Sequence, residues 1–356
     1  MQHGGKGLDK KVKWGIIAAG GIAKRRTLPA MHLCDNAEII AVMDKDEDAL
    51  KSIQKEYGIR NVYDNEDELL HNPEVEAVYV ASPVCFHKEQ ARKVLAVGKH
   101  LLLEKPIGLT LEEAKDVLNY VKEVPQKAGV GMVMKMHPGH QKIRALIQEG
   151  SLGNIVNCRA QLTCWFPDME HNWRQKKATG GGGALVDMGI HCIDLLQYLL
   201  DDEVEKVYAD VATKTFRYEV DDSADCMLRM KKGANCFIDV HFNIPDEAAW
   251  GMLEIYGTKG SIIATGTIGQ DGGGEIRLAL SDSNTAYDSQ QNRENKNAIQ
   301  LLEYERQDIY ARQITQMSEA IINNTEVFTT IQQAYETMRV IDALYRSSKE
   351  EKAVRL

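Results

Sequence analysis

The alternation of short apolar runs with helical periods constrains the fold of this chain more than any other feature. The apolar runs cover residues 12–18, 38–43, 75–81, 100–103 and 129–134, and stretches with helical periodicity separate them at 22–33, 49–57, 88–97 and 111–124. Strands that are apolar on both faces belong to parallel sheets that helices cover on each side. Residues 11–134 are therefore predicted to form an α/β domain with a doubly wound parallel sheet, the Rossmann arrangement.

The pattern of apolar runs and helical stretches changes after residue 134. Apolar runs at 155–163, 204–215, 226–230, 236–242 and 252–256 follow one another with few helices between them, joined by turns such as Lys231-Lys232-Gly233. Helical stretches are expected at 141–148, 186–200, 305–323 and 331–349, and the polar stretch 265–297 is expected to be a long loop or arm. Residues 135–356 are predicted to form an α+β domain with a large, open, mostly antiparallel sheet.

Composition excludes several classes of function. The 43 Lys and Arg residues against 52 Asp and Glu leave a net charge of −9, which gives no general attraction to nucleic acid or to an anionic membrane. No run of 18 apolar residues occurs, so we expect no membrane span, and the first residues lack the apolar segment of a secretion signal. The 7 cysteines include no C-x-x-C pair, so we expect reduced thiols in a cytoplasmic protein.

The first apolar run ends in Ala18-Ala19-Gly20-Gly21-Ile22-Ala23 and opens a helix. A dinucleotide pyrophosphate binds at such a place, on backbone amides at the helix N-terminus. Gly20 and Ala23 fit the fingerprint, whereas Ala18 stands where glycine is usual. Asp44 ends the second run, where a carboxylate accepts hydrogen bonds from the adenosine ribose and repels a 2′-phosphate. The predicted cofactor is NAD, which this carboxylate favours over NADP despite the adjacent Lys45.

Two further loops lie at the carboxyl ends of predicted strands, where ligands of open α/β sheets bind. One begins with Ser82-Pro83 and is followed by His87, which by itself is more typical of a packed or helix-capping histidine. The other is Glu104-Lys105-Pro106. The complete set of predicted cofactor-binding residues is Gly20, Gly21, Ile22, Ala23, Asp44, Lys45, Ser82, Pro83, His87, Glu104 and Lys105.

Four glycines at 180–183 lead into a predicted helix on which Asp187 and His191 lie four residues apart on one face. Glycines there let the backbone approach a ligand or cofactor closely. A cation such as Lys105, a carboxylate and an imidazole are the groups needed to polarise a hydroxyl, remove its proton and stabilise the resulting carbonyl. These three residues are the predicted catalytic residues.

The Glu104-Lys105-Pro106 triplet, the Gly180–His191 segment and Tyr256-Gly257-Thr258-Lys259-Gly260 together resemble the Gfo/Idh/MocA family of nicotinamide-dependent sugar and polyol oxidoreductases. The resemblance runs nearly end to end. It implies a Rossmann domain, an open-sheet domain that also makes homo-oligomer contacts, and a small-molecule sugar, polyol, glycoside or inositol substrate. It also implies that Lys105, Asp187 and His191 meet the substrate at the nicotinamide, and in some similar enzymes the cofactor stays tightly bound.

The substrate pocket is predicted from residues near these motifs. Lys135 stands where many family members have an arginine, and Trp173-Arg174 is the aromatic and cationic pair nearest the glycine run. The predicted substrate-binding residues are Lys105, Lys135, Trp173, Arg174, Asp187 and His191. In the hypothesised mechanism His191 takes the hydroxyl proton, Lys105 donates a hydrogen bond to the developing oxyanion, and Asp187 orients the hydroxyl or the imidazole. The favoured reaction is oxidation of a pyranose or glycoside secondary hydroxyl, with C3 as a candidate carbon.

Three alternatives stand beside this hypothesis. His137 and His140, spaced H-x-x-H, offer metal ligands together with Asp187 and His191, but the cysteines show no zinc-site spacing, so no metal is predicted. A sugar or dinucleotide sensor that has lost catalysis would keep the same fold. A dihydrodiol or bile-pigment reductase is a third alternative, since these activities occur in similar proteins.

Overall fold

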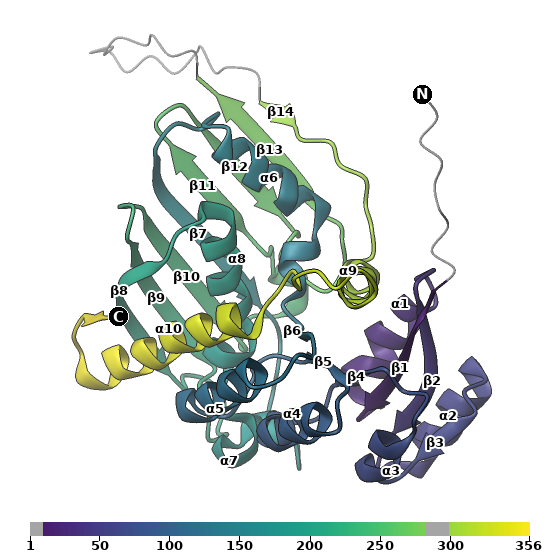
Figure 1. Cartoon of the computed structure of the whole chain (residues 1–356). Helices are drawn as coiled ribbons and strands as arrows, with labels where there is room; N and C mark the ends of the chain where they lie inside the picture. The colour runs from purple at the N-terminus through teal and green to yellow at the C-terminus, as the bar shows by residue number, and fades with distance from the viewer. Residues whose placement is uncertain (1–9, 282–298) are drawn as a thin grey trace, which may run out of the picture. The chain divides into compact units, whose positions relative to one another are not determined.

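The structure is a computed structural model that describes residues 10–281 and 299–356. The chain divides into two compact units (Figure 1). The first unit contains the described residues up to Val133 together with Tyr310–Tyr335, and the second contains Met134–Ile309 and Glu336–Leu356. Each unit therefore takes part of its chain from the C-terminal region.

The described residues of the first unit form a six-stranded sheet in the order β3-β2-β1-β4-β5-β6. All neighbouring strands are parallel, which confirms the predicted doubly wound sheet. The polar strand β3 escaped prediction because it has no apolar run. The strands are β1 (Val12–Ile17), β2 (Ala37–Met43), β3 (Asn61–Tyr63), β4 (Ala77–Val80), β5 (His100–Leu103) and β6 (Ala128–Val130).

Helices connect these strands. The expected helix at 22–33 is a π-helical turn, η1, followed by a short α-helix. Asp46 caps α2 by accepting the amides of Asp48 and Ala49, and Thr110 caps α5 by accepting the amide of Glu113. The helical elements are η1 (Ala23–Thr27), α1 (Leu28–Met31), α2 (Glu47–Tyr57), α3 (Glu66–His71), η2 (Val84–Phe86), α4 (His87–Ala96), α5 (Leu111–Lys122) and α9 (Ile309–Asn323).

The segment Tyr310–Tyr335 completes the core of the first unit. The Trp14 indole donates to the Ser318 hydroxyl at 3.1 Å, and Ile314 and Met317 are buried in the same hydrophobic cluster as Trp14. The sequence analysis assigned the whole of 135–356 to the second domain, and this segment departs from that assignment. The reason is that this segment packs on a core formed much earlier in the chain, since 304 residues separate Trp14 from Ser318, and local periodicity does not encode such a contact.

The described residues of the second unit form a nine-stranded sheet in the order β14-β13-β12-β11-β7-β10-β9-β8-β15 (Figure 1). Among these strands β7 and β10 form the one parallel pair, so the predicted mostly antiparallel sheet is confirmed. The strands are β7 (Ile155–Thr163), β8 (Val204–Ala212), β9 (Ser223–Met230), β10 (Asn235–His241), β11 (Leu253–Gly257), β12 (Gly260–Thr265), β13 (Glu275–Leu280), β14 (Gln300–Leu301) and β15 (Val354–Arg355).

The expected loop or arm at 265–297 is only partly a loop. Strand β13 lies inside it and pairs with β12, because Ile276 and Leu278 alternate with polar residues and bury one face. Residues 282–297 of the expected arm lie outside the described residues.

The helical elements of the second unit follow the prediction closely. They are η3 (Val133–Met136) at the boundary, α6 (Pro138–Gln148), η4 (Trp173–Gln175), α7 (Lys177–Gly180), η5 (Leu185–Gly189), α8 (Ile190–Leu200), η6 (Asp246–Ala248) and α10 (Ile331–Glu350), which begins in the first unit. In the described chain one helical stretch, 177–200, is long and apolar enough to cross a membrane, but 78% of its most apolar window is buried, as in a core helix.

The two faces of the second sheet differ. On one face the side chains, such as Ala160, Ile238 and Ile255, are buried, and α8 packs against β7 and β10. The other face is exposed and carries apolar side chains in neighbouring register positions: Tyr208 lies opposite Met227, and Met227 lies opposite Phe237. The sheet is therefore open on one side.

Candidate active site

The loop after β1 and the end of β2 are joined by hydrogen bonds. The Gly20 amide donates to Asp44 Oδ2 at 2.7 Å, and the Asp46 amide donates to Asp44 Oδ1 at 3.0 Å. A Cβ on Gly20 would lie 3.0 Å from the Asp44 carboxylate, so a side chain there would crowd it. Lys45, the neighbouring residue, is exposed. The predicted fingerprint glycine and the predicted ribose-binding carboxylate therefore lie next to each other.

Ala18 explains why glycine is usual at its position. Its φ is +62°, in the left-handed region that a side chain disfavours by about 1–2 kcal/mol. Ala23 is fully buried, as close packing of helix on sheet requires. A Cβ on Gly21 would meet nothing within 4 Å. Open space at Gly21, together with the amides of Gly21, Ile22 and Ala23 at the start of a helix, fits a pyrophosphate.

His87 ties two loops of the first unit together. Its Nε2 lies 2.8 Å from the Ser82 carbonyl oxygen and its Nδ1 lies 2.6 Å from that of Pro106. Burial lowers the pKa of His87, although both carbonyl contacts oppose this shift. Ser82 is also buried and donates to Gln90 Oε1, while Pro83 precedes η2. His87 thus holds the Pro83 loop against the Glu104-Lys105-Pro106 loop.

Glu104 is buried beneath its loop. It accepts a hydrogen bond from the Tyr79 hydroxyl at 2.6 Å, and Thr27 donates to the same hydroxyl at 3.2 Å. Burial, followed by the Glu104 charge, raises the pKa of Tyr79 well above its usual value. Lys105, which follows, is only partly buried, and its peptide bond to Pro106 is cis. Sequence reasoning missed Tyr79, whose place within an apolar strand resembled ordinary core.

The second unit brings three predicted site residues together. Asp187 lies in η5 and His191 lies in the first turn of α8, and both are partly exposed. The Arg174 guanidinium lies 4.0 Å from Asp187 Oδ1 and 4.2 Å from the ring centre of Trp173. The predicted pair Trp173-Arg174 therefore lies beside the predicted carboxylate, and a cation, an aromatic face and a carboxylate share one surface.

Lys135 is buried and ion-paired, a position that fits structural support better than direct substrate contact. Its Nζ lies 2.7 Å from Asp194 Oδ1, and the two side chains are 4% and 3% exposed. Burial raises the pKa of Asp194, and the charge of Lys135 opposes that rise. Asp194 lies one helical turn after His191. Sequence reasoning missed it, although a charged residue in so apolar a helix was a signal.

At three glycines of the 180–183 run, other atoms of the protein occupy the space that a side chain would need. A Cβ on Gly180 would lie 2.7 Å from the Arg174 carbonyl oxygen, one on Gly182 would lie 2.3 Å from the Tyr345 hydroxyl, and one on Gly183 would lie 1.8 Å from the Asp221 carbonyl oxygen. Glycine at these three positions is therefore required by packing within the protein, and the expected approach of this backbone to a ligand stays a prediction. The three glycines bring the backbone close to neighbouring parts of the same unit.

The two histidines of the H-x-x-H pattern have structural partners. His137 Nδ1 accepts the amides of Gly139 and His140 and so caps α6, and its Nε2 contacts the Gly273 carbonyl. Burial and the neighbouring His137 lower the pKa of His140 to about 3. Within residues 10–281 and 299–356 no group of three or more His, Cys, Asp or Glu side chains is arranged to hold a metal ion.

Comparison with known proteins agrees with this geometry. Residues 12–132 match the family model described as an oxidoreductase family with an NAD-binding Rossmann fold, and residues 140–263 match the GFO/IDH/MocA C-terminal domain. The chain is 27% identical over 267 residues to 1,5-anhydro-D-fructose reductase from Ensifer adhaerens, covering 75% of this chain and 79% of that protein. It is 30% identical over 260 residues to glucose-6-phosphate 3-dehydrogenase from Bacillus subtilis, covering 69% and 72%.

The fold of the whole chain matches solved structures. Aldose-aldose oxidoreductase from Caulobacter crescentus, complexed with glycerol, superposes with a TM-score of 0.87 at 23% identity, over 98% of this chain and 100% of that one. The fold and the family matches define an NAD(P)-dependent oxidoreductase that acts on CH–OH groups. The chain belongs to the Gfo/Idh/MocA family, and it is also 28% identical over 259 residues to myo-inositol 2-dehydrogenase from Thermotoga maritima, covering 70% of this chain and 74% of that protein.

Proposed function

We propose that this protein oxidises a secondary hydroxyl of a pyranose or glycoside with NAD, reversibly, and that C3 of the sugar ring is the carbon oxidised. The observation that carries the proposal is the cluster of Trp173, Arg174 and Asp187 beside the start of the helix that bears His191. An aromatic face and a guanidinium suit the C–H and O–H surfaces of a sugar. The relative named glucose-6-phosphate 3-dehydrogenase, at 30% identity, favours C3.

The roles of the residues follow from their chemistry. His191 accepts the proton of the substrate hydroxyl, because a neutral imidazole is the base best matched to neutral pH. Lys105 donates a hydrogen bond to the oxygen as negative charge develops on it. Asp187 orients the hydroxyl or the imidazole, with Arg174 fixing its carboxylate at 4.0 Å. When bound, NAD supplies the acceptor for the hydride that leaves the carbinol carbon.

The proposed cofactor is NAD in preference to NADP. Asp44 presents its carboxylate at the end of β2, directly beside the Gly20 amide, and a 2′-phosphate placed there would meet its negative charge. Binding titrations with NADH and NADPH test this preference. We expect Asp44→Ser to lose most of the discrimination, whereas equal binding of both cofactors by the wild-type protein would contradict it. Analysis of the supernatant of denatured protein tests for cofactor retained through purification.

A substrate panel tests the proposed reaction. Glucose, glucose 6-phosphate, methyl glucoside, a 1,5-anhydro sugar and myo-inositol are incubated with NAD, and NADH formation and loss of two hydrogens from the sugar are followed. Lys105→Ala and His191→Ala should abolish turnover and leave NADH binding largely intact, with any loss of binding confined to Lys105→Ala. Lys115→Ala, on an exposed position of α5, is the matched control and should behave like wild type. Full activity of either site variant would overturn the assigned roles, and no turnover with any compound would favour the sensor alternative.

We also propose that copies of the chain associate through the open face of the second sheet, in the cytoplasm. Exposed apolar residues on a sheet face typically mark a contact surface. Those on this face are Tyr208, Met227, Phe237, Tyr256, Ile263 and Leu301. Light scattering of wild type and Phe237→Glu tests the association, and a wild-type monomer at micromolar concentration would contradict it. The proposed cytoplasmic location rests on the cysteine pattern of the sequence, which contains no C-x-x-C pair.

A further inference from the structure

A single residue, Asp221, holds the start of the helical segment that bears Asp187 and His191. The Gly183 amide donates to Asp221 Oδ1 at 2.9 Å, and the Leu185 amide donates to Asp221 Oδ2 at 2.8 Å. Between them, the Ala184 amide donates to the Asp221 backbone carbonyl at 2.9 Å. Three consecutive amides at the N-terminus of η5 therefore share one partner, and the carboxylate also complements the positive end of the helix dipole.

Tyr345, on α10, fixes the carboxylate itself. Its hydroxyl donates to Asp221 Oδ1 at 2.6 Å, and Asp221 is only 7% exposed. The same hydroxyl lies where a Cβ on Gly182 would fall, and the Asp221 backbone lies where a Cβ on Gly183 would fall. Both partners are therefore adapted to this contact, because only glycine at 182 and 183 leaves space for the Tyr345 hydroxyl and the Asp221 backbone.

The Asp221 contact lies next to the proposed catalytic residues. The Asp187 amide donates to the Gly183 carbonyl at 2.9 Å, so the residue held by Asp221 is hydrogen-bonded to the residue that carries the proposed carboxylate. His191 follows in α8, which continues η5 without a break. A shift of the Gly183–Leu185 backbone therefore moves Asp187 directly and turns the first turn of α8.

We propose that Asp221, supported by Tyr345, is a positioning residue that sets the place of Asp187 and His191 for hydride and proton transfer. This inference rests on the proposed function. Asp221 touches neither substrate nor cofactor in this role, and it acts only through the backbone of the segment that carries the two side chains.

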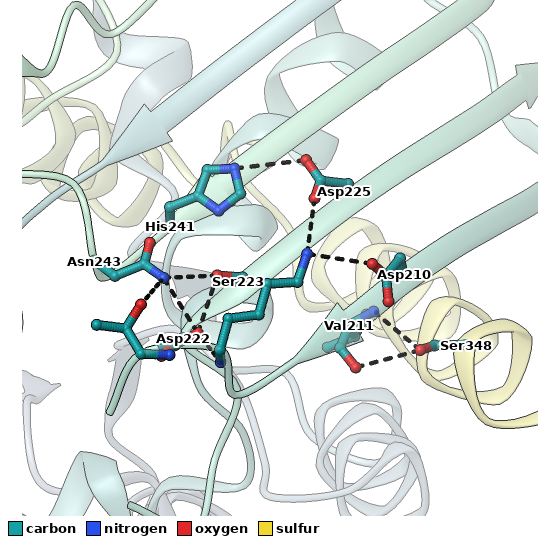
Figure 2. Close-up of polar contacts among 10 residues, drawn as sticks. Asp210, Val211, Asp222, Ser223, Asp225, His241, Asn243 and Ser348 are labelled. Atoms are coloured by element: carbon teal, nitrogen blue, oxygen red, sulfur yellow. Dashed lines mark hydrogen bonds and ion pairs between the residues drawn. The ribbon is translucent and has the colours of Figure 1, made fainter. Parts of the chain in front are cut away.

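The adjacent residue, Asp222, offers a matched control. It is also buried, and it accepts the amides of Lys214, Thr215 and Phe216, so it anchors a different loop. Figure 2 shows Asp222 with its neighbours Ser223 and Asn243, both of which donate to its Oδ1. Asp222→Asn removes a buried carboxylate of similar surroundings without loosening the Gly183–Leu185 amides.

Hydrogen–deuterium exchange of the full-length protein without ligands tests the anchor. Loss of hydrogen bonds to a charged group should speed exchange of residues 183–191 by about 10- to 100-fold in Asp221→Asn and by about 3- to 5-fold in Tyr345→Phe. Asp222→Asn should speed exchange at 214–216 and leave 183–191 unchanged. Unchanged exchange at 183–191 in both Asp221→Asn and Tyr345→Phe overturns the anchor.

Kinetics with the panel compound that the wild type oxidises fastest test the positioning role. Asp221→Asn should lower kcat by about tenfold or more, because a displaced base costs rate steeply. The dissociation constant for NADH should stay unchanged, and the deuterium isotope effect on kcat should rise as hydride transfer becomes limiting. A merely structural role would lower the active fraction and move neither KM nor the isotope effect.

The outcomes separate the anchor from the proposed function. Faster exchange with kcat, KM and isotope effect all unchanged overturns the positioning role. Tyr345→Phe, which removes one hydrogen bond and no charge, decides the question where Asp221→Asn does not fold. Absence of turnover by the wild type across the panel overturns the proposed function and the catalytic purpose of the anchor, while the exchange data still show whether the anchor exists.

Discussion

Two glycine-containing turns open helices in this molecule, one in each unit, and their glycines serve opposite purposes. In the first unit a Cβ on Gly21 would meet nothing within 4 Å, and that space faces the start of η1. In the second unit, Cβ atoms on Gly182 and Gly183 would collide with Tyr345 and Asp221. The first turn has room for an added atom at its glycine, whereas in the second the protein's own groups occupy the space that a side chain at Gly182 or Gly183 would need.

The difference shows that a glycine run before a helix does not by itself indicate ligand contact. Glycine allows close approach, but the approaching group is either a phosphate or another part of the chain. A ligand-binding glycine should affect binding and spare stability, whereas a packing glycine should do the reverse. Among the predictions that follow, Gly183→Ala and Gly21→Ala test this contrast directly and the others compare the two units; all are ordered from the largest expected effect to the smallest.

Acidification should weaken the second unit most. The pKa of His140 falls from 6.5 to about 3 through burial and the neighbouring His137, so the unfolded chain binds a proton that the folded chain does not. Stability is fully present above pH 6.5 and is lost as the pH falls toward 3, by about 1.4 kcal/mol per pH unit and roughly 4–5 kcal/mol in all. Denaturant titrations from pH 7 to pH 4 measure the slope.

His140→Gln is the control for the acid effect, since the amide keeps a donor for the Met134 carbonyl that His140 contacts at 2.8 Å. Its slope should be flatter than that of wild type. An identical slope would assign the acid sensitivity to other groups. His87 of the first unit should contribute less, because its two carbonyl contacts favour the protonated ring.

Gly183→Ala should destabilise the protein by about 3 kcal/mol, because the new methyl would lie 1.8 Å from the Asp221 carbonyl oxygen and the backbone must move. Chemical denaturation gives the change in the free energy of unfolding. Gly269→Ala, whose Cβ would meet nothing within 4 Å, is the matched control and should cost little. Equal stability of the two variants would show that the second turn is not closed by packing.

Gly21→Ala should show the opposite pattern. The added methyl has space in the protein, so unfolding should change by less than about 0.5 kcal/mol, but it intrudes where a pyrophosphate approaches the amides. NADH should bind about tenfold more weakly, equivalent to about 1.4 kcal/mol. Fluorescence titration measures this, and unchanged NADH binding would remove the basis for the contrast between the two turns.

Ala18→Gly should stabilise the first unit by about 0.5–1 kcal/mol. Glycine relieves the left-handed backbone at φ +62°, which outweighs the entropy that glycine adds to the unfolded chain. Thermal unfolding should show a small rise in Tm. A drop in Tm would mean that the methyl of Ala18 contributes packing that exceeds its backbone strain.

Most of the fold could be predicted from local sequence patterns. The apolar runs, their spacing and the residues at strand ends placed Gly20 beside Asp44 because β1, η1 and β2 form one continuous unit of chain. Asp187 and His191 were identified by their separation on one helix. In each case residues near in sequence determined the result, and hydrophobic periodicity reports such local order directly.

The remaining features of the fold and the site depend on contacts between residues far apart in sequence, and these could not be predicted. Asp221 and Tyr345 reach the glycine run from 38 and more residues away, and no spacing rule links them to it. Lys135 seemed a substrate ligand because its partner, Asp194, lies on another helix. Asp194 was visible only as a charge inside an apolar helix, which signals a partner without identifying it, and Asp221 lies among polar residues that gave no such signal.

The return of residues 310–335 to the first unit bears on how the protein is made. The residues of the N-terminal sheet emerge from the ribosome long before Ser318, the hydrogen-bonding partner of Trp14, is synthesised. Nor is the second unit complete until Tyr345 has emerged. Both cores of the nascent chain therefore stay incomplete until residues 310–345 have emerged, and no single cut in the described polypeptide separates the two units intact.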